Sequence, residues 1–232
     1  MSKLSRARAG LWLMWLLVLA LLLALGSWQW QRAEQKRQWL AQRSAEPLQL
    51  RWRAQLDEAL QGNRWLPVVA ALEWLPVEPL LLDNRTHQGR AGYEVLQPAR
   101  LADGSTVLVN RGWLAAPVRR EQRPRVTTLS GVTRVEALAG VPVASFTLAS
   151  ASDEPWRLQT LSLAQASEYW GLPLAPWALW LAQPDASGLV ARVPGTGQLP
   201  PERHLGYALQ WFALALTLFG LGLWLEWRRR RS

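Results

Sequence analysis

The chain has 232 residues, half of them apolar, and its 26 lysines and arginines exceed its 17 acidic residues to give a formal net charge of +9. It has no cysteine and two histidines, which excludes disulfides, thiolate copper sites, cysteine nucleophiles and the usual zinc clusters. Much of the positive charge lies beside two long apolar segments, so we interpret it as topogenic and lipid-facing. No nucleic-acid partner is expected.

The first predicted element is a transmembrane helix. The stretch from Ala9 to Gln31 carries no charge and is close to the roughly 20 apolar residues needed to cross a bilayer. Trp28 and Trp30 suit an uncleaved helix whose end reaches the membrane interface. A cleaved signal peptide is the alternative, because "ALG" at residues 24–26 resembles a cleavage site. The helix formers of residues 31–46 predict that the helix continues along the membrane surface.

The middle of the chain is predicted to form a mainly antiparallel β domain with a few helices, an α+β fold. Asp103-Gly104 is a strong hairpin signal between two of its strands. "RAQLDEALQG" and "LAQASEYW" predict short helices that end at Gly62 and Gly171. "VPGTGQLPPER" predicts a linker back to the membrane. The predicted strands are "PLLLDN" at 79–84, "YEVLQPARL" at 93–101, "STVLVN" at 105–110 and "SFTLAS" at 145–150.

The last predicted element is a second transmembrane helix. Residues 205–225 are uncharged, and the arginines of Arg228–Arg231 follow them, whereas Glu202 and Arg203 cancel on the other side. The excess of arginine predicts a cytoplasmic C-terminus, and two spans place both termini on one side. The predicted organisation is a cytoplasmic tail (1–10), a first span (11–30), an extracytoplasmic domain (31–202), a second span (204–225) and a basic cytoplasmic tail (226–232).

We expect no enzymatic activity. A catalytic triad needs a histidine that exchanges protons with a nucleophile in a fixed geometry. His87, in the turn-like stretch "DNRTHQGRAGY", is the only histidine of the middle segment, and no nucleophile-elbow motif surrounds Ser105 or Ser130. The hypothesis of an extracytoplasmic hydrolase would hold only if His87 faced a nucleophile.

Two predicted strands end in asparagine-arginine pairs, Asn84–Arg85 and Asn110–Arg111. The asparagines suit strand ends because their side chains can bond nearby backbone. If the strands are neighbours, both guanidinium groups project at one rim of the sheet, where they would suit a carboxylate of a partner or of a haem propionate. The alternative is an internal salt bridge with Asp83 or Asp103. Trp113, which follows the second pair, is expected to pack in the core or to lie at the surface.

The second span begins with a distinct helical face. His204, Tyr207, Ala208 and Trp211 have the spacing i, i+3, i+4 and i+7. One interpretation is an aromatic belt at the lipid headgroups with a histidine beside it. The other is an imidazole that ligates an iron at the outer membrane surface, with flat rings to pack on a porphyrin. The spacing leaves both open.

Three stretches of the chain resemble one family. They are "GSWQWQRAEQKRQWL" after the first span, which has the pattern Gly-x-Trp-Gln-x-x-Arg, then "LLLDNRTHQGRAGYEVLQPARLADGSTVLVNRGWL", and "HLGYALQWFALAL" in the second span. Together they are similar to the surfeit locus protein one family, membrane factors that help assemble cytochrome c oxidase. "PPER" stands before His204 where the family is usually rich in asparagine, and residues 127–198 show little similarity. The matching positions are Gly26, Trp28, Gln29, Arg32, Asn84, Arg85, Gly89, Tyr93, Asn110, Arg111, Gly112, Trp113, His204, Tyr207 and Trp211.

The resemblance implies a bacterial plasma-membrane protein with a periplasmic domain, whose partners are the bilayer and the oxidase's catalytic subunit or an assembly intermediate. It implies that His204 binds the iron of haem a, beside Tyr207 and Trp211. Arg85, Arg111, Asn84, Asn110 and Trp113 then become candidates for contact with a partner or a propionate. A scaffold that holds the oxidase intermediate through the β domain without haem is the alternative.

Overall fold

The computed structural model describes residues 3–61, 65–117, 119, 122–142, 154–194 and 199–231, and the chain divides into two compact units. One is a helical hairpin of Met1–Leu40 and Gly197–Ser232, and the other is a β domain of Ala41–Thr196.

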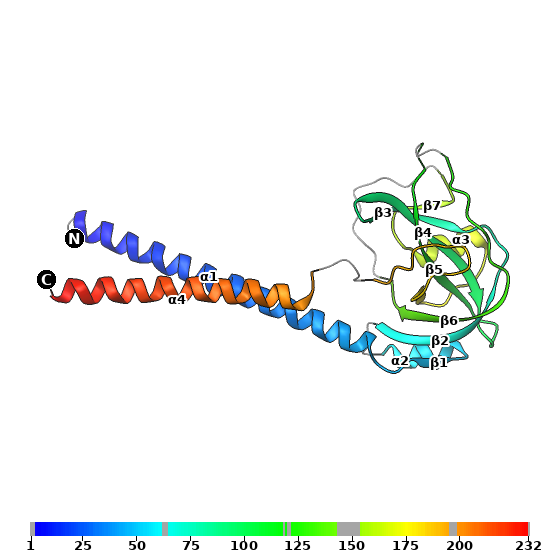
Figure 1. Ribbon diagram of the computed structural model, residues 1–232, viewed down its shortest axis with the longest axis horizontal. Coiled ribbons are helices and arrows are strands. Elements are labelled where there is room, and N and C mark those ends of the chain that lie inside the picture. Colours follow the sequence, from blue (N-terminus) through cyan, green and yellow to red (C-terminus); the bar gives the residue numbers. More distant parts are fainter. Residues whose placement is uncertain are drawn as a thin grey trace. The chain divides into compact units, whose positions relative to one another are not determined.

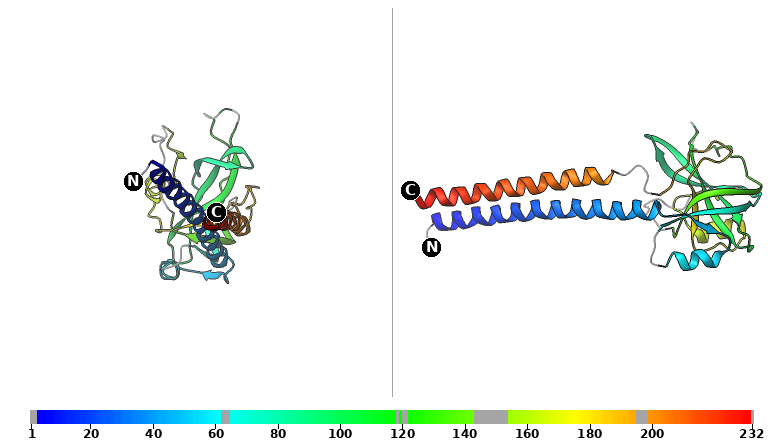
Figure 2. Two further views of the ribbon diagram at one scale, coloured as in Figure 1. Left: turned by 90° about the vertical axis from the view of Figure 1, so that its left-hand side faces the viewer. Right: turned by 60° about the horizontal axis from the view of Figure 1, so that its bottom comes forward.

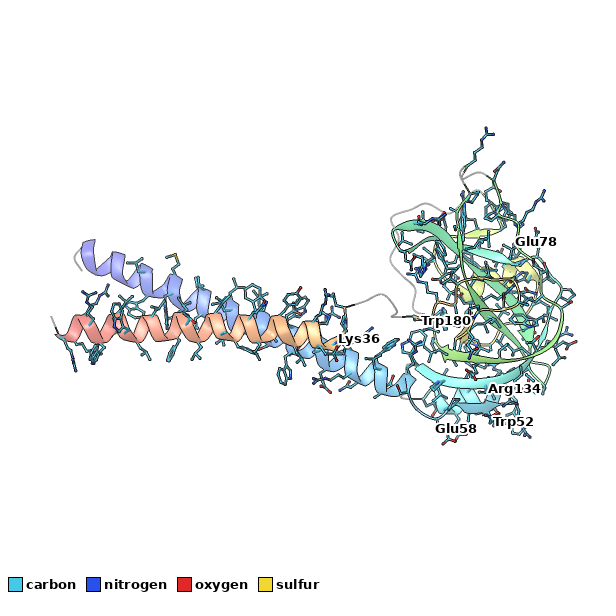
Figure 3. The ribbon with its side chains drawn as sticks, viewed as in Figure 1. Lys36, Trp52, Glu58, Glu78, Arg134 and Trp180 are labelled. Atoms are coloured by element: carbon cyan, nitrogen blue, oxygen red, sulfur yellow. The ribbon has the colours of Figure 1, made fainter. Side chains whose placement is uncertain are left out.

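The hairpin consists of α1 (Lys3–Arg43) and α4 (Pro201–Arg231), which lie antiparallel with both chain termini at the same end (Figures 1 and 2). Both helices are long and apolar enough to cross a membrane, by length and composition. The prediction that the first helix continues past its apolar part is confirmed, since α1 extends to Arg43. In this extension lies Lys36, labelled in Figure 3. Its Nζ is 4.2 Å from the ring centroid of Trp39. The predicted linker is corrected at its end, because Pro201 already begins α4.

Small residues let the two helices pack closely. On α4 a small or compact residue is buried at every seventh position, from Pro201 through Ala208 and Ala215 to Gly222. This spacing keeps one face of a helix against its neighbour. A Cβ at Gly222 would lie 2.7 Å from the indole of Trp15, so α1 fills the space that the glycine leaves. The Trp15 Nε1–H donates to the carbonyl of Leu218 at 3.1 Å, which satisfies a polar group within the apolar pair.

The β domain is built on one mixed sheet in the order β1-β2-β6-β8-β5-β4-β3-β7. An additional pairing of β2 with β4 closes β2, β6, β8, β5 and β4 into a five-stranded barrel. The strands, labelled in Figure 1, are β1 (Leu48–Leu50), β2 (Trp65–Trp74), β3 (Leu80–His87), β4 (Arg90–Arg100), β5 (Thr106–Ala115), β6 (Gly131–Gly140), β7 (Arg157–Leu158) and β8 (Ala178–Leu181).

The predicted sheet was mainly antiparallel, and the observed one is mixed. The pairs β1–β2, β3–β7 and β5–β8 are parallel. Each includes a strand of two to four residues, too short to show an alternating pattern in the sequence. The long strands β2 and β6 were also not predicted, and the predicted strand "SFTLAS" lies outside the described residues.

Local turn and helix signals were predictive. The Asp103-Gly104 hairpin between β4 and β5 is confirmed, and so is α3 (Leu163–Trp170) with Gly171 as its left-handed cap. Asp103 also accepts a 2.7 Å bond from the backbone N–H of Arg53, the first residue of α2 (Arg53–Ala59). Slight burial would raise the pKa of Asp103, but bonds from the backbone N–H groups of Arg53 and Ser105 outweigh it and lower that pKa.

The core lies on both faces of the barrel strands. Because side chains alternate along a strand, Val107 and Val109 of β5 belong to one cluster with α2 and β1, whereas Leu108 belongs to another with α3. Trp180 of β8, labelled in Figure 3, meets Trp65 edge to face in the second cluster, with ring centroids 5.1 Å apart. The short helix α2 therefore packs against one cluster, and α3 packs against the other.

A charged side chain stands at the centre of this domain. Arg111 of β5 is fully buried, and its Nε lies 2.7 Å from Oδ2 of Asp185, which is also largely buried. Its other donors reach Gln97 Oε1 at 2.8 Å, the carbonyl of Thr127 at 2.7 Å and the hydroxyl of Ser187. The guanidinium thus joins β5 and β4 to the segments around residues 127 and 185–187.

Arg111→Ala is expected to lower the free energy of unfolding by about 3–5 kcal/mol, because it leaves the Asp185 carboxylate buried without its partner. The full chain in detergent would be unfolded with urea and followed by tryptophan fluorescence. The control is Arg100→Ala at the exposed end of β4, with an expected change within about 0.5 kcal/mol. Equal effects of the two substitutions would contradict the role of Arg111.

Candidate functional site

The first candidate site lies at the start of α4, where it faces α1. His204 is half-buried, and its Nδ1 lies 2.8 Å from Oε1 of Gln29 on α1. Ala208 and Trp211 follow on the helix, the first buried and the second half-buried. Tyr207 lies beside this stripe with 41% of its surface exposed, so the predicted face is divided between the helix contact and the outside.

The α1 side of the site comes from the stretch with the Gly-x-Trp-Gln-x-x-Arg pattern, and its members have two roles. Gly26 and Gln29 face α4, where a Cβ on Gly26 would lie 2.6 Å from the ring of Phe212. Trp28 is exposed, and the guanidinium of Arg32 lies 5.7 Å from the centre of its ring. The pattern therefore combines a close helix contact with an aromatic and cationic outer face.

This arrangement fits an iron-bearing macrocycle. An imidazole with one ring nitrogen engaged by a neighbouring side chain is the usual form of a histidine ligand, which uses its other nitrogen for the metal. The rings of Tyr207 and Trp211, about one and two turns further along α4, offer flat apolar surfaces. Among the described residues no group of three His, Cys, Asp or Glu side chains could hold a bare metal ion.

The second candidate site lies in the β domain around Trp113. We call it the Trp113 cluster, and it consists of Arg85, His87, Glu94, Asn110, Trp113 and Arg192. The indole of Trp113 lies over Gly92, donates to the carbonyl of Arg85 at 2.8 Å and has its centre 5.1 Å from the ring of His87. A side chain at Gly92 would occupy the space of that indole, which explains a glycine near the start of β4.

Two arginine nitrogen atoms of this cluster have no hydrogen-bond acceptor. Glu94 is buried and accepts a 2.7 Å bond from Asn110, while Arg192 approaches its other oxygen at 3.7 Å. The Nη1 of Arg192 and the Nε of Arg85 are buried without a hydrogen-bond partner. No carboxylate lies within 4 Å of Arg85 across the ranges that the structure covers. The guanidinium of Arg85, a half-buried residue, therefore has capacity to bind an anion.

The predicted arginine rim is corrected by these positions. Arg85 lies in the Trp113 cluster, but Arg111 is inside the domain, so the two do not share an exposed rim. The internal salt bridge of Arg111 exists, with Asp185 as the partner in place of Asp83 or Asp103. The strand ends predicted at Asn84 and Asn110 do not exist, because β3 and β5 continue past these residues. Within a continuous strand, adjacent residues point to opposite faces of the sheet.

Both asparagines have local roles. Asn84 has a φ of 59° at the bulge of β3, and its amide donates to Gln159 at 2.7 Å. The Oδ1 of Asn110 accepts from the N–H of Gly112 at 3.0 Å, as expected of an asparagine that bonds nearby backbone. Gly112 has a φ of 128° and no space for a Cβ beside Val190. Sequence reasoning missed Glu94 and Arg192, and Arg192 comes from the stretch with little family similarity.

Comparisons with known proteins identify the family of this chain. A profile described as the SURF1 family matches residues 16–216. A SURF1-like protein of Rickettsia conorii is 26% identical over 221 residues, covering 90% of this chain and 88% of that protein. One of Rickettsia felis is 28% identical, covering 88% and 91%. An uncharacterized SURF1-like protein of Mycobacterium tuberculosis is 28% identical over 76% of this chain, which spans 66% of that protein's length. The match takes in both helices and the β domain between them, and the chain belongs to the SURF1 family.

Proposed function

We propose that this chain is a membrane-anchored assembly factor for cytochrome c oxidase, and that it holds haem a at His204 before the haem enters the oxidase's catalytic subunit. The contact between His204 and Gln29 carries the proposal, because it fixes an imidazole at the end of an apolar helix pair. The family membership supports the general role in oxidase assembly, and the resemblance of the α4 motif supports haem a as the cargo.

A carrier must bind its cargo and also release it. The sequence of the hairpin unit contains one histidine, which supplies one axial ligand to the iron. The second axial position is then open, filled by water, or supplied by the receiving protein. Incomplete ligation suits transfer better than storage, and it requires no chemical conversion of the haem. We therefore propose a carrier without enzymatic activity of its own.

The site also suits the physical properties of haem. A porphyrin is apolar over most of its surface and partitions into the bilayer, whereas its propionates favour the headgroup region. His204 lies one turn inside α4, near the polar residues Glu202 and Arg203, and most of the exposed side chains between residues 205 and 225 are apolar. We propose that both helices cross the bacterial plasma membrane, with the β domain on the periplasmic side and both termini in the cytoplasm.

This orientation predicts the behaviour of topology reporters. A reporter that is active only in the cytoplasm should be active after Ser232 and silent when inserted at the exposed turn near Asp103. The arginines that follow the apolar part of α4 provide the reason, since they resist translocation. The reverse pattern would contradict the proposed orientation.

His204→Ala is expected to remove most of the haem from protein made in cells that synthesise haem a. The iron loses its axial ligand, so the haem retained per protein should fall by more than about tenfold, since even indirect supports of a metal ligand contribute 10–100-fold. Trp211→Ala should reduce retention to a smaller extent, because it removes a packing surface only. Absorption spectra of the purified proteins measure both effects.

The control for this experiment is His87→Ala, which removes the other histidine of the chain. It should keep the wild-type haem content, and all variants should reach the membrane in equal amounts. An unchanged spectrum in His204→Ala would leave the aromatic-belt interpretation in place.

A second candidate function is a scaffold that holds an oxidase assembly intermediate through the β domain. The half-buried Arg85, whose guanidinium has no acidic partner among the described residues, favours it, because a guanidinium suits a carboxylate of a partner protein. This function does not require haem, and the two functions are compatible in one chain.

Arg85→Ala is expected to lower oxidase assembly in cells at least about fivefold, if its guanidinium supplies 1–3 kcal/mol to a charged contact. Protein abundance should stay normal, because the side chain has no acidic partner to leave uncompensated. Arg90→Ala, an exposed arginine of the same β-hairpin, is the control. Haem-containing oxidase would be measured in membranes. Lost abundance, or equal effects of the two variants, would contradict a partner contact.

A further inference from the structure

We infer that Gln29 is a positioning residue that holds His204 in the tautomer with the proton on Nδ1 and the lone pair on Nε2. The observation is the 2.8 Å contact between Gln29 Oε1 and His204 Nδ1, which joins residues 175 positions apart on two helices. The part that concerns the cargo rests on the proposed function, but the tautomer itself does not.

The direction of the bond follows from the chemistry of the two groups. An amide oxygen only accepts hydrogen bonds, so the nitrogen that faces it must carry a proton. A neutral imidazole has one N–H, and if that proton is on Nδ1, then Nε2 has the free lone pair. In water the neutral histidine side chain favours the opposite tautomer, with the proton on Nε2. Gln29 therefore reverses the ordinary preference at this position.

The surrounding packing keeps the two side chains in register. On α1, Gly26 lies one turn before Gln29 and Ala33 one turn after it, and both are buried. On α4, Ala208 is buried one turn after His204. These small residues bring the helix backbones close on both sides of the contact, so a mid-length side chain such as glutamine reaches the imidazole directly.

The result is an imidazole prepared for coordination. Histidines that bind metals usually donate their second ring N–H to a neighbouring acceptor, which fixes the tautomer and the ring orientation and makes the ligand more basic. Here that acceptor is a neutral amide, so the site gains orientation without adding a negative charge to an apolar helix pair. Loss of such a partner typically lowers metal affinity 10–100-fold.

The tautomer can be measured without haem. The chain has two histidines, so protein labelled with ¹⁵N-histidine gives two sets of imidazole signals, and His87→Gln assigns them. The full chain in detergent would be studied at alkaline pH, where imidazole is neutral. We expect His204 to show a protonated Nδ1 and an unprotonated Nε2 in the wild type.

The variants separate positioning from helix packing. Gln29→Met keeps the length of the side chain but removes the acceptor, so His204 should shift toward the Nε2-protonated tautomer. Gln29→Glu keeps an acceptor oxygen and should retain the wild-type pattern. Gln31→Met is the matched control, because Gln31 is exposed on the same helix two residues away. A purely structural role would give the same tautomer in Gln29→Met as in the wild type.

Haem retention gives a second readout on the same proteins. Gln29→Met should lose about 10–100-fold in haem affinity, Gln29→Glu should be restored toward wild type, and Gln31→Met should be unchanged. An Nε2-protonated His204 in the wild type would overturn the inference, and so would an unchanged tautomer in Gln29→Met. If Gln29→Met fails to fold, the Nδ1-protonated pattern in wild type and Gln29→Glu decides the question.

Failure of the proposed function would look different. If the tautomers behave as expected but neither the wild type nor any variant retains haem, the positioning role stands and the cargo is wrong. If His204→Ala loses haem while Gln29→Met binds it with wild-type affinity, the cargo is right and the positioning role is wrong.

Discussion

The close approach of α1 and α4 is the constraint on which the candidate haem site depends. Apolar helices gain little from the hydrophobic effect when lipid surrounds them, so their association relies on close packing and on polar contacts between helices. Both are present here, in the buried small residues of α4 and in the contacts of Trp15 and Gln29. A larger residue at Gly26 would separate the helices where the glutamine must reach its histidine.

The β domain depends on a different kind of interaction. Arg111 holds three segments of the β domain together, namely those at residues 97, 127 and 185–187. Its guanidinium does so by donating hydrogen bonds to four acceptors. The same strand carries Trp113, the centre of the Trp113 cluster, in which Arg85 Nε and Arg192 Nη1 have no hydrogen-bond partner. Arg111 therefore stabilises the fold, and Trp113, two residues further along β5, belongs to the second candidate site.

Much of the local structure could be predicted from the sequence, but most long-range partners could not. The Asp103-Gly104 turn, the helix that ends at Gly171 and the polar extension of the first helix follow from neighbouring residues. The predicted internal salt bridge of Arg111 exists, but its partner was predicted wrongly. The partner, Asp185, lies 74 positions away in a stretch without a family pattern. The strands β2 and β6 were missed because neither shows strict alternation, and Pro67 interrupts the first of them.

The separation of Gln29 from His204 in the sequence has a consequence for biosynthesis. The first helix is made before α4, and its contact on α4 arrives 175 residues later. The β domain also closes late, since Arg111 must wait for residues near 185. Contacts between such distant positions form slowly, because a long loop must close before they contribute. A chain that ended before α4 would retain the first helix but lack the contact between Gln29 and His204.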